Sequence, residues 1–314
     1  MRAGPDRYRQ RKGTSVSETK PAKGGGKISI EKLGHLDQLT FDGASVAEKN
    51  TLYKLDVDGF RFDFLWRPKT HQPRLFVMFS GDARRDKYTP PVFQRWSWAK
   101  RFPGSCLFFS DPSLQLSDKL GLAWYSGTTD FDPLIPIRGI VERVAELIGV
   151  APDGIFSYGS SGGGFAALRL CSMMSQAGCV TINPQIVIPR YIERHVRLYL
   201  DTCFGGISPE EALARFPDRF DLSHNPGRFR DKRIIFMQNT LDTHHFDEHY
   251  GAFCRSIGTS LEASAAAEPG LTKVLFERPG GHAKGEGEAE FDLAMTIVRS
   301  YPLSSDGTAG QQSE

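Results

Sequence analysis

The sequence predicts an α/β protein with a mostly parallel central sheet and helices on both faces. Two observations lead to this fold class. Short apolar runs alternate along the chain with longer segments of helical periodicity, a pattern typical of parallel strands joined by crossover helices. In addition, 39% of the 314 residues are hydrophobic, which is enough to bury one sizeable core.

The first two expected strands, 53–57 and 60–66, flank Asp58-Gly59, a dipeptide that favours a hairpin turn. Six later apolar runs are also expected to be strands: 75–79, 106–110, 154–158, 180–183, 233–238 and 273–277. Helical spacing is found at 137–148 and 165–174, on either side of the fifth strand. It returns at Phe291, Met295 and Val298, which predicts a closing helix.

A glycine-rich turn separates the fifth strand from the helix that follows it. Its sequence, Tyr-Gly-Ser-Ser-Gly-Gly-Gly at 158–164, contains the pattern G-x-S-x-G with Ser161 at its centre. Glycines on both sides let the chain pass close to a strained backbone. Such a turn projects the Ser161 hydroxyl into a cleft and leaves the Gly162 amide free at a helix N-terminus, where it can bind an oxyanion.

A serine nucleophile needs a base to accept its proton and a carboxylate to orient that base. Two later loops supply these groups in the expected order. Asp242 follows the seventh strand, and His282 follows the eighth in a Pro-Gly-Gly-His segment. Asp247 and Glu248 are rivals of Asp242, because one sequence does not fix the register of a loop.

With serine, acid and histidine in this order, residues 55–301 resemble the α/β-hydrolase superfamily. The resemblance implies that Ser161 is the nucleophile, His282 the general base and Asp242 its orienting acid. The superfamily takes a second oxyanion donor from the loop after its third strand. That loop reads Ser-Gly-Asp at 80–82 in place of the usual His-Gly pair, so the amide of Asp82 is expected to join that of Gly162 in the oxyanion hole.

The segment 185–230 stands where the superfamily usually carries a cap, and it contains helical candidates at 189–200 and 209–216. A short cap insertion is therefore expected. Aromatic residues beside a cation are candidates for gripping a sugar ring or an anionic group. Arg95 beside Trp96 is such a combination, and Trp124 is a further aromatic candidate. Packing of these loops against the core is the alternative interpretation.

Histidines and carboxylates also gather after the seventh strand, at Asp242, His244, His245, Asp247, Glu248 and His249. Two of these histidines, four residues apart, would share a helix face and offer a metal two ligands. The cluster lacks the His-Glu-x-x-His pattern, and the hydrolase interpretation already uses its first member, so no metal is expected. The glycines at 159–164 lack the Lys of a phosphate-binding loop, so no nucleotide or other cofactor is expected either.

The five cysteines are odd in number and lack metal-ligand spacing, which predicts reduced and mostly buried thiols. No apolar run reaches the ~18 residues of a membrane-spanning helix, and the N-terminus lacks the apolar core of a secretory signal, so a cytoplasmic location without stable membrane insertion is expected. Residues 1–27 carry eight Lys or Arg against two acidic residues. They and 304–314 are expected to be disordered tails around a domain at 28–303, with no nucleic-acid partner.

The predicted function is hydrolysis of a carboxylic ester through an acyl-enzyme. The same site becomes a glycan acyltransferase where a sugar hydroxyl replaces water. The segments 79–81, 110–112, 123–125 and 158–163 are also similar to bacterial α/β-hydrolase-like proteins associated with surface-polysaccharide and glycoprotein export. That similarity implies an acylated glycan or glycoconjugate as the substrate, beside a small-molecule ester as the other expected partner, and it supplies a third possibility, a non-catalytic accessory module. The oligomeric state is not indicated.

Overall fold

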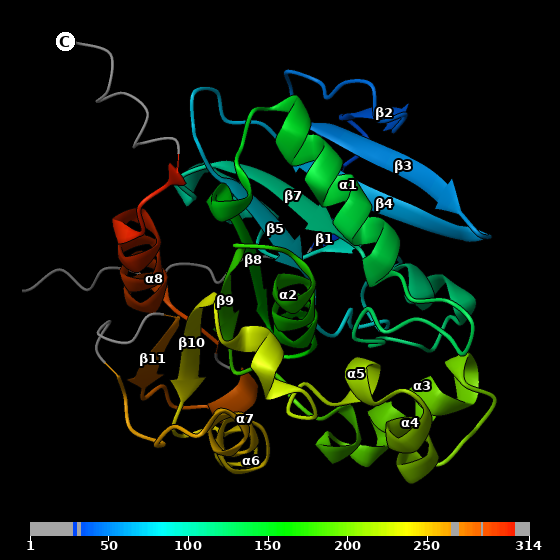
Figure 1. Ribbon diagram of the computed structural model, residues 1–314. Helices are drawn as coiled ribbons and strands as arrows, with labels where there is room; N and C mark the ends of the chain where they lie inside the picture. The colour runs from blue at the N-terminus through cyan, green and yellow to red at the C-terminus, as the bar shows by residue number, and fades with distance from the viewer. Residues whose placement is uncertain (1–27, 30–32, 265–269, 284, 305–314) are drawn as a thin grey trace, which may run out of the picture.

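The computed structural model describes residues 28–29, 33–264, 270–283 and 285–304 (Figure 1). The expected tails, 1–27 and all of 304–314 except Ser304, lie outside the described residues. A nine-stranded sheet has the order β11-β10-β9-β8-β5-β7-β4-β3-β2. A separate antiparallel pair is formed by β1 (Ile28–Ser29) and β6 (Val92–Phe93).

All eight expected strands are present in the large sheet, and their ends lie within two residues of the expected ones. They are β3 (Thr51–Val57), β4 (Phe60–Arg67), β5 (Leu75–Phe79), β7 (Ser105–Phe109), β8 (Ile155–Ser160), β9 (Gly178–Ile182), β10 (Arg233–Asn239) and β11 (Leu271–Phe276). The ninth, β2 (Asp37–Thr40), pairs parallel with β3 and was not expected.

The order of the strands reverses around β5. The antiparallel hairpin of β3 and β4 turns at Asp58-Gly59, as expected, and β4 pairs antiparallel with β7. From β7 to β11 the neighbours are parallel, with β7 on one side of β5 and β8 on the other. Open α/β sheets bind their ligands at the carboxyl ends of the strands, where the order reverses. The loops after β5 and β8 meet at this point.

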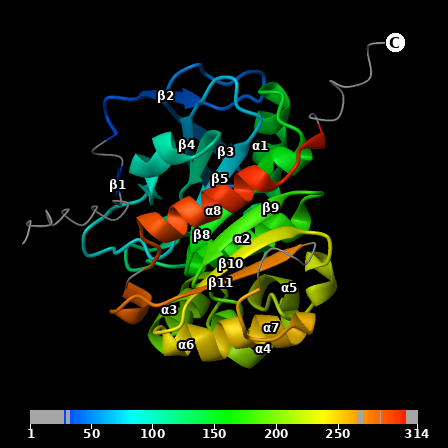
Figure 2. The ribbon, with the colours of Figure 1, turned by 90° about the vertical axis from the view of Figure 1, so that its left-hand side faces the viewer.

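Helices cover both faces of the sheet (Figures 1 and 2). On one face, α1 (Leu134–Leu147) and α2 (Gly162–Met173) pack in the larger hydrophobic core; on the other, α8 (Glu288–Ser300) packs in a second core. Strand β5 shows why both cores form, because it is buried throughout. Leu75, Val77 and Phe79 face the first core, and Phe76 and Met78 face the second.

The segment 185–230 contains a 3₁₀ turn, η5 (Ile188–Arg190), followed by α3 (Glu193–Cys203), α4 (Pro209–Arg215), α5 (Pro217–Phe220) and η6 (Pro226–Phe229). Both helices expected there are present, the first of them split between η5 and α3. The remaining helical segments are η2 (Trp96–Arg101), η3 (Pro112–Leu116), η4 (Pro152–Gly154), α6 (Thr243–His245), the π-helical turn η7 (Phe246–Tyr250), α7 (Gly251–Ile257) and η8 (Gly281–Ala283).

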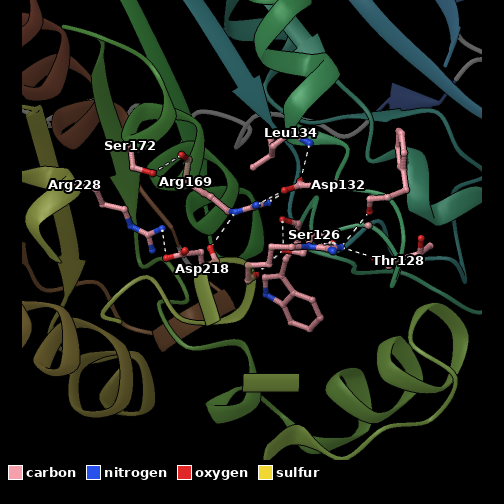
Figure 3. A network of polar contacts seen from close by, with 12 residues as sticks. Ser126, Thr128, Asp132, Leu134, Arg169, Ser172, Asp218 and Arg228 are labelled. Atoms are coloured by element: carbon pink, nitrogen blue, oxygen red, sulfur yellow. Dashed lines mark hydrogen bonds and ion pairs between the residues drawn. The ribbon is translucent and has the colours of Figure 1, made fainter. Parts of the chain in front are cut away.

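A network of arginines ties this segment to α2 (Figure 3). Arg169 of α2 forms a bidentate ion pair with Asp132, and its Nε donates to the carbonyl of Asp218 at 3.2 Å. Arg219 of α5 donates to several carbonyls of residues 126–131. The network is cationic and largely buried, so carbonyls and a carboxylate take the place of water around each guanidinium.

All five cysteines are free and buried, which confirms the expectation for the thiols. Within the part of the chain that the structure describes, none of the helices combines the length and the apolar composition that crossing a bilayer requires.

Candidate active site

The turn between β8 and α2 has the geometry that the glycine pattern predicts. Ser161 lies between the two elements with φ 56° and ψ −126°, a sparsely populated conformation for a residue with a side chain. A Cβ on Gly159 would lie 2.1 Å from the carbonyl oxygen of Gly163, and a Cβ on Gly163 would lie 2.6 Å from that of Phe79. Only glycine fits at either position, and the strained turn depends on both.

The structure brings together the serine, histidine and aspartate that the sequence singled out. Ser161 Oγ lies 2.9 Å from His282 Nε2, and His282 Nδ1 lies 2.9 Å from Asp242 Oδ2. Asp242 stands at the N-cap of α6, after β10, and His282 lies in η8, after β11. The rivals Asp247 and Glu248 are exposed on the next turn of chain. The three residues follow β8, β10 and β11, parallel strands whose carboxyl ends lie at one edge of the sheet, which explains why residues so distant in sequence meet.

Asp242 is held as an anion by its two imidazole neighbours. Burial opposes its ionisation, but hydrogen bonds from His245 and His282 outweigh that effect and lower the pKa of Asp242 below its ordinary value. Its side chain is only 5% exposed. An ionised carboxylate only accepts hydrogen bonds, so both histidines donate from Nδ1.

Two residues to which the sequence analysis gave no catalytic role complete this cluster. The ring of His245 stacks on that of His282, with 3.9 Å between centroids and 8° between planes, and its Nδ1 lies 3.1 Å from Asp242 Oδ1. Gln185, fully buried after β9, lies with its Nε2 2.8 Å from Ser161 Oγ and 2.9 Å from His245 Nε2. One feature of the sequence could have pointed to Gln185. It follows an expected strand, as Ser161, Asp242 and His282 do, so its side chain would be expected at the same edge of the sheet.

Ser161 and His282 open into a cleft of about 690 Å³ at the carboxyl ends of β5 and β8. The residues lining it are mostly polar, with two aromatic side chains among them: Gly81, Asp82, Arg84, Lys87, Tyr88, Gln94, Arg95, Trp98, Ser160, Ser161, Asn183, His282, Gly285 and Glu286. Of the three residues expected to grip a substrate, Arg95 is in this lining. Among the described residues, neither Trp96 nor Trp124 lines the cleft. Trp124 is fully buried, and its Nε1 donates to Gln185 Oε1 at 3.1 Å.

Arg95 lies in the cleft wall as part of a buried ion pair. Its guanidinium forms a bidentate pair with Glu286, donates to Ser160 Oγ at 2.9 Å, and lies over the ring of Tyr158. The hydroxyl of Tyr158 donates to Glu286 at 2.9 Å. Burial alone would lower the pKa of Arg95, but the charge of Glu286 outweighs burial and raises it. Glu286 therefore neutralises the charge of Arg95 before any substrate binds.

The two expected oxyanion donors lie beside the serine. Gly162 is the first residue of α2, and Asp82 lines the cleft with Gly81. A Cβ on Gly81 would lie 3.7 Å from that of Ser161, so the loop after β5 passes close to the nucleophile. The side chain of Gln94 fixes this loop by donating to the carbonyl of Asp82 at 3.3 Å. Donation by the Gly162 and Asp82 amides to an oxyanion stays a prediction.

Asp242, His245 and His282 also form a group that could hold a metal ion, with one ligand atom from each within 4.8 Å of the others. Both carboxylate oxygens are already engaged by imidazole nitrogens. His249, which the sequence placed in the same cluster, instead accepts a hydrogen bond from the Ile186 amide through its Nδ1. In this loop, His245 therefore contacts Asp242, and His249 contacts the backbone.

The sequence matches no protein-family model, and a search of curated proteins finds no significant match. Solved structures are similar over most of the chain. A histidine-to-alanine mutant of the capsule O-acetyltransferase of Neisseria meningitidis serogroup A, in complex with CoA, has a TM-score of 0.54 at 16% identity, covering 79% of this chain and 94% of that one. The acetyl xylan esterase from Paenibacillus sp. R4 has a TM-score of 0.51 at 16% identity, covering 78% and 81%. The Glycosylation Associate Protein complex from Streptococcus agalactiae has a TM-score of 0.50 at 15% identity, covering 81% and 45%. Together with the strand order, these likenesses establish the α/β-hydrolase fold that the sequence predicted.

Proposed function

We propose that this protein is a serine hydrolase that cleaves carboxylic esters through an acyl-enzyme. One observation carries the proposal: Ser161, His282 and Asp242 are joined by two hydrogen bonds of 2.9 Å each, at the wall of an open cleft. A nucleophile within hydrogen-bond distance of a base, itself oriented by a carboxylate, is the arrangement that acyl transfer requires.

In the proposed mechanism, His282 Nε2 accepts the hydroxyl proton of Ser161 while Oγ attacks the ester carbonyl. The amides of Gly162 and Asp82 donate to the resulting oxyanion, and loss of such a donor typically costs ~3 kcal/mol in the transition state. His282 then gives its proton to the departing alcohol. In the second half, the same nitrogen takes a proton from water, which attacks the acyl-enzyme and releases the acid.

The lining of the cleft favours an acylated carbohydrate as the substrate class. Amide, hydroxyl and guanidinium groups are present beside the aromatic rings of Tyr88 and Trp98, a combination suited to a sugar ring with its many hydroxyls. Two of the solved structures with this fold carry names that refer to acetyl groups on glycans. They support the same class for this chain.

A second candidate is transfer of the acyl group to a glycan hydroxyl instead of water. It is favoured by the size of the polar cleft and by the exposure of Arg84 and Lys87 in its lining, which leave room for an acceptor sugar beside the nucleophile. The chemistry up to the acyl-enzyme is identical, and the two functions differ only in which hydroxyl reaches Ser161. A competition experiment distinguishes the two functions. If transfer is the function, adding a glycan acceptor should lower the amount of free acid released and yield acylated glycan.

The first test is labelling of the purified protein with a fluorophosphonate probe, which reacts with activated serines. We expect labelling of the wild type and none of Ser161→Ala or His282→Ala. Ser172→Ala is the matched serine control, because the Ser172 hydroxyl bonds only a carbonyl of its own helix. A folded wild type that neither labels nor hydrolyses acetylated xylan or p-nitrophenyl acetate would favour the accessory-module alternative.

A further inference from the structure

The hydrogen bonds around Ser161 close into a ring of five side chains. Ser161 contacts His282, His282 contacts Asp242, Asp242 contacts His245, His245 contacts Gln185, and Gln185 returns to Ser161. All five distances lie between 2.8 and 3.1 Å. The first three residues form the triad of the proposed function, and the other two have no part in the mechanism above.

Backbone contacts hold Gln185 against the nucleophile. The backbone N–H of Gln185 donates to the carbonyl of Ser161 at 3.3 Å. The backbone N–H of Ser161 donates in turn to the carbonyl of Ile182 at the end of β9. The side chain is fully buried, so no water competes for its amide group. The position of Gln185 is therefore fixed by the same turn that fixes Ser161.

Trp124 determines which way the Gln185 amide points. An indole nitrogen is only a donor, so Gln185 Oε1 accepts from Trp124, and Nε2, with its two hydrogens, faces Ser161 and His245. His245 Nε2 must then be an acceptor, which leaves its proton on Nδ1, where it donates to Asp242. His282 takes the same tautomer, so its Nε2 is free to accept the hydroxyl proton of Ser161. One assignment of protons satisfies all five bonds.

We propose that Gln185 is a catalytic residue that donates an N–H to Ser161 Oγ, and that His245 is a positioning residue that holds Gln185 and Asp242 for this purpose. This inference rests on the proposed function. The Gln185 donor occupies one lone pair of Oγ and directs the hydroxyl proton to His282. It also stabilises the negative charge on Oγ when the proton leaves, and again when the serine is expelled from the acyl-enzyme.

His245 cannot act in place of His282. It is 2% exposed, whereas a third of the His282 side chain is exposed. Burial and the nearby charge of His282 keep the pKa of His245 low, at about 4, although Asp242 opposes the shift. His245 therefore remains neutral while His282 takes and gives the proton, and its two nitrogens keep one donor and one acceptor throughout the cycle.

The proton assignment is tested without any substrate, by nitrogen NMR of the ¹⁵N-histidine-labelled protein. The expected spectrum at neutral pH shows a protonated Nδ1 and an unprotonated Nε2 on His245, with Gln185→Met moving the His245 Nε2 signal. A proton on Nε2 of His245 would overturn the ring, because two donors would then face each other. This outcome is independent of whether the protein is an esterase.

The catalytic part is tested by pre-steady-state hydrolysis of p-nitrophenyl acetate, which separates acylation from deacylation. Met at position 185 has nearly the length of Gln and no N–H. We expect Gln185→Met to slow acylation about 10- to 100-fold, the usual effect of losing a hydrogen bond to a developing charge, with KM within about two-fold of wild type. His245→Asn retains a group near the Nδ1 position that can reach Asp242 but not Gln185, and should slow acylation about 10-fold.

The matched control is His249→Asn, which removes a buried histidine from the same loop and keeps an acceptor for the Ile186 amide. Its acylation rate should equal that of the wild type, and thermal unfolding identifies any variant that fails to fold. A wild type that forms no acyl-enzyme contradicts the proposed function. An active wild type with a folded Gln185→Met variant of equal acylation rate contradicts the catalytic role of Gln185.

Discussion

Two buried polar networks meet α2, and they differ in what their protons can do. The ring at Ser161 precedes the first turn of the helix and consists of a serine, a glutamine and two imidazoles beside the ionised carboxylate of Asp242. The network around Arg169, two turns further along, consists of guanidinium groups facing carbonyls and the carboxylate of Asp132 (Figure 3). Arginine does not lose its proton in proteins, whereas an imidazole exchanges its proton near neutrality. The first network is suited to moving a proton and the second to fastening chain segments together.

The largest expected effect comes from removing the proposed general base, His282, from the ring at Ser161. Because His282 is the only histidine of the ring that lines the cleft in the described part of the chain, His282→Ala should lower kcat for ester hydrolysis by about 10⁴-fold or more. Its unfolding free energy should change little, since the side chain is partly exposed. The exposed His244 gives the matched control, and His244→Ala should retain wild-type kcat. Retention of activity by the His282 variant would refute its role as base.

Breaking the arginine network should have the opposite signature. Arg169→Met leaves the largely buried carboxylate of Asp132 without its partner, which should lower the unfolding free energy by about 3–5 kcal/mol. Urea denaturation measures this loss. The double variant Arg169→Met/Asp132→Leu removes both charges and should recover most of it. In the absence of denaturant, the kcat of the folded protein should stay near the wild-type value; a large loss of kcat would couple the two networks.

The pH dependence of stability should distinguish the networks as well. The folded protein protonates His245 only at about pH 4, whereas the unfolded chain protonates it near 6.5. Between these values the unfolded state holds more protons, so stability is complete above pH 6.5 and is lost as the pH falls to 4, by about 3 kcal/mol. Burial lowers the pKa of His249 as well, and that acts in the same direction.

Urea denaturation at a series of pH values checks this dependence. The slope should be smaller in His245→Asn, whose new side chain has no proton to take up. It should be unchanged in Arg169→Met/Asp132→Leu, which removes both charges of the arginine pair and leaves His245 in place. Equal slopes in all three proteins would contradict the assignment to His245.

The smallest expected effect lies on the surface of α4. Arg215 and Glu211 pair at 2.9 Å across one helical turn, and each is nearly half exposed. Removing this pair with Glu211→Ala should lower the unfolding free energy by no more than about 0.5 kcal/mol, because solvent screens exposed charges. Chemical denaturation of this variant and of Arg169→Met gives their two losses of unfolding free energy. The difference between the losses shows how much more a buried arginine-carboxylate pair contributes than an exposed one.

The sequence predicted most of the sheet because its central strands are buried runs with clear boundaries. Strand β2 was missed for the converse reason. All four of its residues, Asp37–Thr40, are exposed, so no apolar pattern marks it, and it joins the sheet through backbone pairing with β3. The short helices after Asp242 were missed too, since they include an irregular π-helical turn.

Within the candidate site, the sequence singled out Ser161, His282 and Asp242 by the order of their motifs, and the structure joins these three by hydrogen bonds. Gln185 and His245 were not identified in this way, since their parts depend on distances between segments that periodicity does not encode. The sequence analysis placed His245 in a possible metal-binding cluster and Trp124 among the substrate-binding candidates. Trp124 instead fixes the Gln185 amide from inside the protein, a buried role that composition cannot distinguish from an exposed aromatic in a cleft.

The indole of Trp124 offers an optical reporter of the proposed acyl-enzyme. It is one of four tryptophans, it is fully buried, and a single glutamine separates its nitrogen from Ser161 Oγ. When an acyl group is bound to Ser161, its Oγ becomes an ester oxygen and accepts a weaker hydrogen bond from the Gln185 side chain. The dipole of that side chain, which faces the indole, then changes. The intrinsic fluorescence of the protein should therefore shift as the acyl-enzyme forms and return as it is hydrolysed. A Trp124→Phe variant should lose this signal, so turnover becomes visible without a chromogenic substrate.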